Sequence, residues 1–120
     1  MPNVSIRGFA RAPQMRQRLV HMIAARVDGT GTAAILEGGN EMTLTDNGTG
    51  DYTLTFNTAF ARVPVVTALP ISATGDVILS ISSVAVGSVR IKAWDGTDGT
   101  TAKDIAFHVM IVGFDAADAV

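Results

Sequence analysis

A strict alternation of apolar and polar residues from residue 42 onward constrains this chain most. In the stretch YTLTFN, at 52–57, every second side chain is large and apolar while its neighbours are threonine or asparagine. A period of two is typical of a β-strand with one buried face. Further runs rich in valine, isoleucine and threonine recur at about ten-residue spacing, at 63–69, 77–82, 89–93 and 105–114. The pattern predicts an all-β fold.

Turn residues separate these runs and predict how they connect. We expect two more strands at 20–28 and 31–37, joined at Asp28-Gly29-Thr30-Gly31, because glycine adopts the positive φ of a tight hairpin. The segment DNGTGD at 46–51 should fix the register of the strand that starts at Asp51. The pattern therefore predicts that residues 20–120 form one domain, an antiparallel, jelly-roll-like β-sandwich of about eight strands. The expected structural turn residues are Gly29, Gly31, Gly48 and Gly50.

The N-terminal segment, residues 1–19, is predicted to be a basic arm, either extended or a short helix. Residues 1–26 contain five arginines and no acid, whereas residues 27–120 contain four basic and eleven acidic residues, a net charge of −7. A basic arm ahead of an acidic domain predicts contact with an acidic surface. The residues expected to make this contact are Arg7, Phe9, Arg11, Arg16 and Arg18.

The composition argues against several classes of protein. The chain has no cysteine, so disulfides and thiolate metal sites are excluded. No signal-peptide core and no apolar run of about 18 residues is evident, which predicts a protein made in the cytoplasm without a membrane span. Serine-elbow, phosphate-loop and zinc-protease motifs are absent as well. We therefore expect no enzymatic activity and no cofactor.

Histidines and aspartates are the remaining candidates for chemistry. The two histidines, His21 and His108, are expected to be hydrogen-bonded core or interface residues rather than ligands. Calcium could be held by aspartates in two loops, but their spacing does not match an EF-hand, and we expect no metal site. The aspartates concerned are Asp46, Asp51, Asp95, Asp98 and Asp104.

Two surfaces are candidates for contact with a partner. The first is Trp94, with Asp95 and Asp98 in the loop that follows. Its ring would bind a partner protein or a sugar, or it would instead cover one end of the sandwich. Strand 105–114 is apolar on both faces. The core should be filled by Ile105, Phe107, Val109 and Ile111, which leaves Ala106, Met110, Val112 and Phe114 for a neighbouring subunit. The predicted oligomer interface is Met110, Val112 and Phe114.

Two stretches of the sequence carry a family resemblance. The segment 25–32, ARVDGTGT, followed by 45–60, TDNGTGDYTLTFNTAF, resembles a module of tailed-bacteriophage structural proteins, found in tail-fibre ends and small virion proteins. The resemblance covers about residues 20–114 in order. It implies a trimer-forming β-sandwich within a virion.

The resemblance and the charge pattern together favour a capsid decoration or cement protein, a homotrimer tied to the major capsid protein or another virion protein by its arm. The alternative is a tail or tail-fibre component that presents loops to a host receptor or glycan. Nucleic-acid binding through the arm is a third hypothesis, which the acidic domain disfavours. We expect no membrane, specific nucleic acid or small-molecule ligand as a partner.

Overall fold

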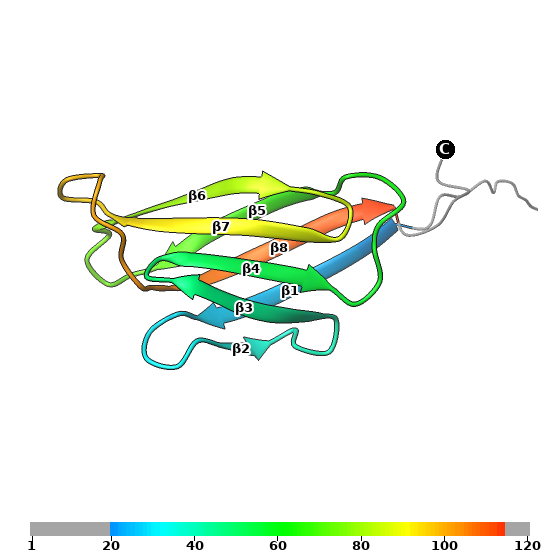
Figure 1. Cartoon of the computed structure of the whole chain (residues 1–120), viewed down its shortest axis with the longest axis horizontal. Helices are drawn as coiled ribbons and strands as arrows, with labels where there is room; N and C mark the ends of the chain where they lie inside the picture. Colours follow the sequence, from blue (N-terminus) through cyan, green and yellow to red (C-terminus); the bar gives the residue numbers. More distant parts are fainter. Residues whose placement is uncertain (1–19, 115–120) are drawn as a thin grey trace, which may run out of the picture.

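The computed structural model describes residues 20–114, which form eight β-strands and no helix (Figure 1). The predicted arm at 1–19, with its arginines and Phe9, lies outside the described residues. The strands are β1 (Val20–Asp28), β2 (Ala34–Glu37), β3 (Met42–Gly48), β4 (Asp51–Phe56), β5 (Val65–Ile71), β6 (Val77–Val84), β7 (Ser88–Asp95) and β8 (Ala106–Phe114).

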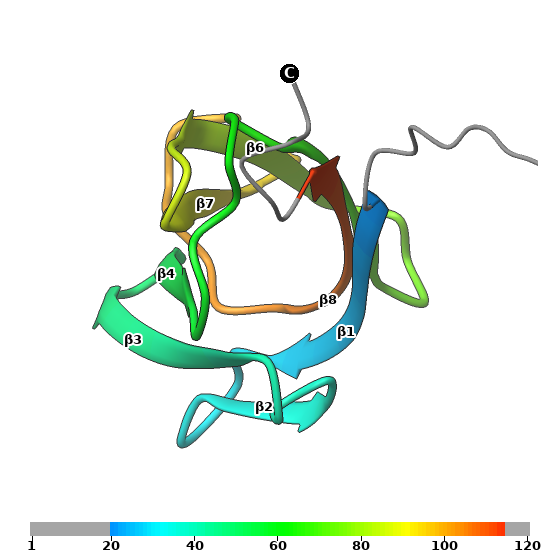
Figure 2. The same cartoon turned by 90° about the vertical axis from the view of Figure 1, so that its right-hand side faces the viewer.

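The strands form two four-stranded sheets in which every pair is antiparallel. Sheet A has the order β2-β1-β8-β5, and sheet B has the order β3-β4-β7-β6. Seen end-on, the two sheets curve around a common interior (Figure 2). The predicted antiparallel sandwich of about eight strands is confirmed. The sequence did not predict the order of the strands within the sheets. In the structure β1–β2, β3–β4 and β6–β7 are hairpins that each stay within one sheet.

The core consists of the inward-facing residues of both sheets. On β4 the alternation works as predicted, because Tyr52, Leu54 and Phe56 are buried while Thr55 is exposed. On β8 the expected inward set is also buried, and β7 contributes three further inward positions. The buried residues of these two strands and of the position before β8 are Val89, Ile91, Ala93, Ile105, Phe107, Val109 and Ile111.

The β1–β2 connection is wider than the predicted tight hairpin. Asp28 pairs with Ala34, so the loop spans 29–33 and the second strand starts three residues later than expected. Gly31 has a φ of +63°, as a turn glycine should. Gly29 is required for a different reason, because a Cβ there would overlap the Tyr52 hydroxyl. The turn is therefore shaped by packing against the core as well as by backbone conformation.

The β3–β4 turn fixes the register of β4. Asp46 Oδ1 accepts a hydrogen bond of 3.0 Å from the Gly48 amide, and the pairing shifts by one residue between Asp46 and Gly48. Gly50 has a φ of +63°, and β4 begins at Asp51. The expected role of this segment in setting the strand register is consistent with that geometry.

Candidate interaction surface

The outer face of sheet A is lined by apolar side chains from three neighbouring strands. On β1 and β8 the even-numbered residues point outward, and on β5 the odd-numbered residues do. The strand register aligns them in rows across β1, β8 and β5: Met22–Val112–Val65, Ala24–Met110–Thr67, Arg26–His108–Leu69 and Asp28–Ala106–Ile71. We call these rows the sheet A face.

Large apolar side chains on the sheet A face are well exposed. The exposed fractions are 56% for Met22, 71% for Val65, 65% for Leu69 and 47% for Met110. A solvated face of an antiparallel sheet is normally polar, and contiguous apolar patches on soluble proteins usually mark contact sites. This face therefore has the chemistry of a surface that becomes covered.

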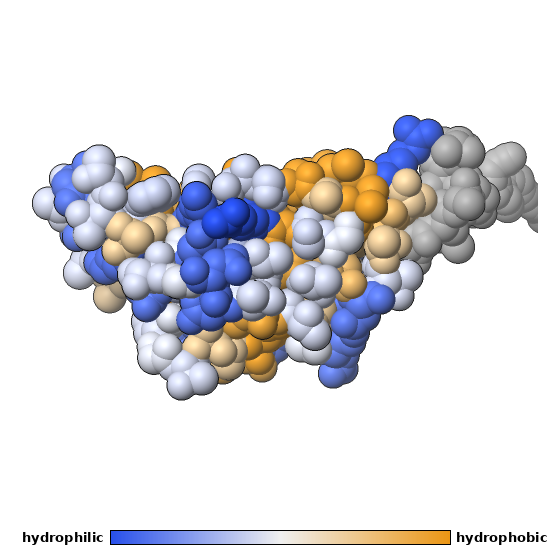
Figure 3. Space-filling view, in the orientation of Figure 1, coloured by the Kyte–Doolittle hydropathy of each residue, from blue (hydrophilic) through white to orange (hydrophobic). Residues whose placement is uncertain are grey.

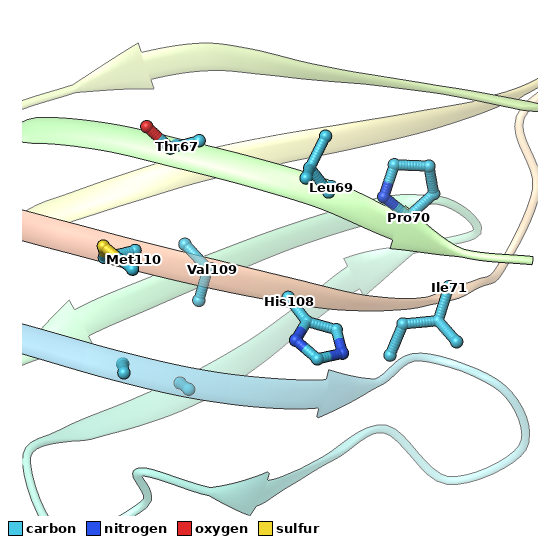
Figure 4. A pocket seen from close by; sticks show the side chains of 9 residues that line it. Thr67, Leu69, Pro70, Ile71, His108, Val109 and Met110 are labelled. Carbon is cyan, nitrogen blue, oxygen red and sulfur yellow. The ribbon is translucent and has the colours of Figure 1, made fainter.

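A hollow lies in the sheet A face between β5, β8 and β1 (Figure 4). Its volume is about 530 Å³. Ala24 leaves room for it because its side chain is much shorter than those of Met22 and Arg26, the next outward residues along β1. Leu69, Ile71 and Met110 stand around it, and His108 is its one titratable lining residue. Such a lining suits an apolar side chain better than a polar substrate.

Charges lie along the β1–β2 margin of the face. Arg26 Nε is 3.9 Å from Glu37 Oε1, and both side chains are largely exposed. Asp28 lies two residues further along β1, and its carboxylate accepts hydrogen bonds from the Thr30 amide and hydroxyl. Those hydrogen bonds lower the pKa of Asp28. Both signs of charge are present on this margin, whereas the outward positions of β5 carry no charge.

The two histidines differ in their surroundings. His108 is exposed on the sheet A face, on the same side of β8 as Met110 and Val112, so of the two expected positions, core or interface, the core is excluded. His21 is half-buried, with Nε2 2.8 Å from Glu41 Oε1 and its ring 5.6 Å from that of Phe60. His21 is therefore a hydrogen-bonded structural residue, as expected.

The outer face of sheet B is more polar than that of sheet A, with Ile78 and Trp94 as its large apolar residues at one end. Arg90 Nε and Nη2 donate hydrogen bonds of 2.9 and 2.6 Å to the two oxygens of Asp51. These hydrogen bonds lower the pKa of Asp51. In Figure 3 the centre of this side of the molecule shows mainly hydrophilic colours, with hydrophobic patches to the right of it and below it. The outward residues around the ion pair are Thr43, Thr45, Thr53, Thr55, Ser80 and Lys92.

Trp94 lies on the outer face of sheet B, opposite Ile78, rather than over the end of the core. It is half-buried, because the loop after β7 folds back and Ala102 pairs with it. In that loop Asp98 Oδ1 accepts hydrogen bonds from the Thr100 and Thr101 amides. The Thr101 hydroxyl and these amides lower the pKa of Asp98 to about 2.

The aspartates considered for calcium serve the loops themselves. Asp95 Oδ1 accepts a hydrogen bond from the Thr97 amide, and Asp104 Oδ1 accepts one from the Gly50 amide. Within residues 20–114, no three histidine, aspartate or glutamate side chains are grouped as a metal site would require. The same residues include no helix of the length and apolarity needed to cross a membrane.

The expected oligomer interface belongs to a larger surface than the sequence indicated. Met110 is exposed on the sheet A face, while Val112 and Phe114 are partly buried toward its end. Sequence reasoning missed the contributions of Met22, on β1, and of β5. The signal was present in VVTALPI at 65–71, where apolar residues occupy both alternating sets.

Comparisons with protein-family models, with curated proteins and with solved structures gave no significant match to this chain.

Proposed function

We propose that this chain is a non-enzymatic structural protein of a bacteriophage virion, a homotrimeric decoration or cement protein bound to the head shell. The contrast between its two outer faces supports this proposal. Sheet B presents mainly threonines and an ion pair to solvent, with Ile78 as an exposed apolar residue at one end, whereas sheet A presents rows of large apolar side chains. A subunit of an assembly has one such face covered and another in water.

The lining of the hollow supports binding rather than catalysis. Its residues are apolar except for Thr67 and His108, and no carboxylate lines it. General acid–base or nucleophilic chemistry generally needs a second group to orient or activate the first. A contact surface needs only shape and apolar area, which this face has.

In this proposal the arm attaches the trimer to the particle. Arg7, Arg11, Arg16 and Arg18 would form forked hydrogen bonds to carboxylates of the major capsid protein. Three arms on one trimer would add avidity on a repetitive shell. The protein would be made in the host cytoplasm and would function in the virion.

Immunogold labelling of purified particles with antibody against this chain tests the proposal. Label over the heads supports a decoration protein, and the absence of the chain from particles by mass spectrometry overturns a virion role. Deleting residues 1–18 should then abolish attachment without unfolding the sandwich. A matched variant with the four arginines changed to glutamine separates charge from length.

The alternative function is a tail or tail-fibre component that presents loops to a host receptor or glycan. The outward, half-exposed position of Trp94 beside the loop 95–101 favours it, because an aromatic ring can stack on a sugar. Label at the tail tip, together with glycan binding that Trp94→Ala abolishes, would select this function over head decoration.

A further inference from the structure

We propose that the sheet A face is covered by the sheet A faces of other copies of this chain around the axis of one homotrimer, with a protruding side chain of each copy seated in the hollow of the next. This inference deepens the proposed function by naming the partner and the surface. It rests on the proposed role as an assembling subunit, but its test uses the purified chain alone.

Shape supports a second copy as the occupant. The hollow beside Ala24 lies on the same face as the exposed side chains of Met22, Val65 and Leu69. A surface that carries both a hollow and protrusions can be complementary to itself, as contacts between identical subunits require. An apolar side chain also suits a lining that is almost entirely apolar.

The size of the face is of the order that a stable contact needs. Three strands about 4.8 Å apart and up to nine residues long cover roughly 15 × 30 Å in projection. Because protruding side chains increase the accessible area above the projected area, the face approaches the roughly 800 Å² per partner of a standard interface. The hollow and the apolar rows lie within this footprint.

Charge favours a second copy over a strongly charged partner. The margin contains Arg26 together with Asp28 and Glu37, and the centre around Met110 carries no charged residue other than the titratable His108. Arg26 of one copy can therefore meet a carboxylate of another, while the apolar rows pack together. A polyanion would be attracted by Arg26 but repelled by Asp28 and Glu37, and a strongly basic partner would meet the reverse.

Sedimentation velocity and light scattering of the purified chain test the inference. The wild type should sediment as an oligomer, with three times 12.5 kDa as the mass expected from the trimer prediction. Met110→Glu and Leu69→Glu should each raise the dissociation constant at least tenfold, because either places a carboxylate within the apolar rows. Ala24→Leu should weaken association without adding charge, because it fills the hollow.

Thr55→Glu is the matched control, since Thr55 is an exposed position on β4, an inner strand of the opposite sheet. It should leave the oligomer unchanged, and circular dichroism verifies that each variant remains folded. A wild-type chain that is monomeric at micromolar concentration overturns the inference. An oligomer that Met110→Glu, Leu69→Glu and Ala24→Leu leave intact overturns it as well. Neither result changes where antibody labels the particle, so failure here is distinct from failure of the virion role.

Discussion

The Tyr52 hydroxyl donates a hydrogen bond of 2.9 Å to Asp104 Oδ1, and the same oxygen accepts one of 2.8 Å from the Gly50 amide. This carboxylate therefore joins β4, the β3–β4 turn and the segment that leads into β8. Burial, with the nearby Asp104 carboxylate, raises the pKa of Tyr52 well above its usual value. The phenol thus remains a donor over the whole range in which the protein would be studied.

Tyr52→Phe should destabilise the fold by about 1–2 kcal/mol, because it removes the hydroxyl and leaves Asp104 with fewer hydrogen bonds. Urea unfolding followed by circular dichroism measures the change. Thr55→Ala, on the exposed side of the same strand, should have a smaller effect. Equal stabilities for Tyr52→Phe and the wild type would show that the hydrogen bond makes no net contribution.

Gly50→Ala should be more damaging than Gly48→Ala, although both glycines have positive φ. A Cβ on Gly50 would lie 2.5 Å from the Ala93 carbonyl oxygen, whereas nothing lies within 4 Å of one on Gly48. We expect a loss of about 1–3 kcal/mol at Gly48 from backbone strain alone, and a larger loss at Gly50. Thermal melts of the two variants provide the comparison, and the reverse order would refute this account of the turn.

The Asp51–Arg90 pair should make the fold sensitive to acid. Hydrogen bonds from Arg90 hold the pKa of Asp51 below its usual value in the folded state. Its contribution to stability is therefore complete well above the unfolded value of about 3.9. The contribution is lost as the pH falls through the lower, folded value. Asp51→Asn should remove that part of the decline, and Arg90→Gln should do the same, in unfolding free energies measured from pH 7 to pH 2.

Assembly through the sheet A face should weaken when a fixed positive charge replaces His108, which lies within it. On β1 the groups facing His108 are Arg26, directly opposite, and Asp28 in the next row, while Glu37 on β2 approaches Arg26. The outward residues of β5 carry no titratable group. An arginine at position 108 would face Arg26 and require water, which a covered face excludes.

Sedimentation velocity at neutral pH tests this expectation. His108→Arg should dissociate, while His108→Gln, which adds no charge, should remain associated. Association of His108→Arg as tight as that of the wild type would contradict the assignment of this histidine to the interface.

The period-two pattern predicted the strands well, because alternate burial on β4 depends only on neighbouring residues. It placed the second strand too early, since the width of the β1–β2 loop depends on how Gly29 packs against Tyr52, far away in sequence. The pairing of β8 with both β1 and β5 was not predicted either. Strand partners so distant in sequence are chosen by tertiary packing rather than by local pattern.

The candidate surface was only partly predicted for the same reason. The apolar outer residues of β8 were evident from its two apolar faces. Met22 and Leu69 join them only when β1 and β5 are known to flank β8 in register. His108 was placed from the pattern on the same face of β8 as Met110 and Val112, but the pattern left open whether that face lies in the core or at the surface.

Val20 and Phe114 are register partners at the same end of the β1–β8 pair. A pulling force applied at these two residues would therefore load one backbone hydrogen bond at a time, because antiparallel bonds lie perpendicular to the strands. The two strands would therefore separate at low force, with their hydrogen bonds breaking in sequence. A force that enters instead through the broad surface of sheet A would be shared among many bonds, so the direction of loading sets the mechanical strength of this domain.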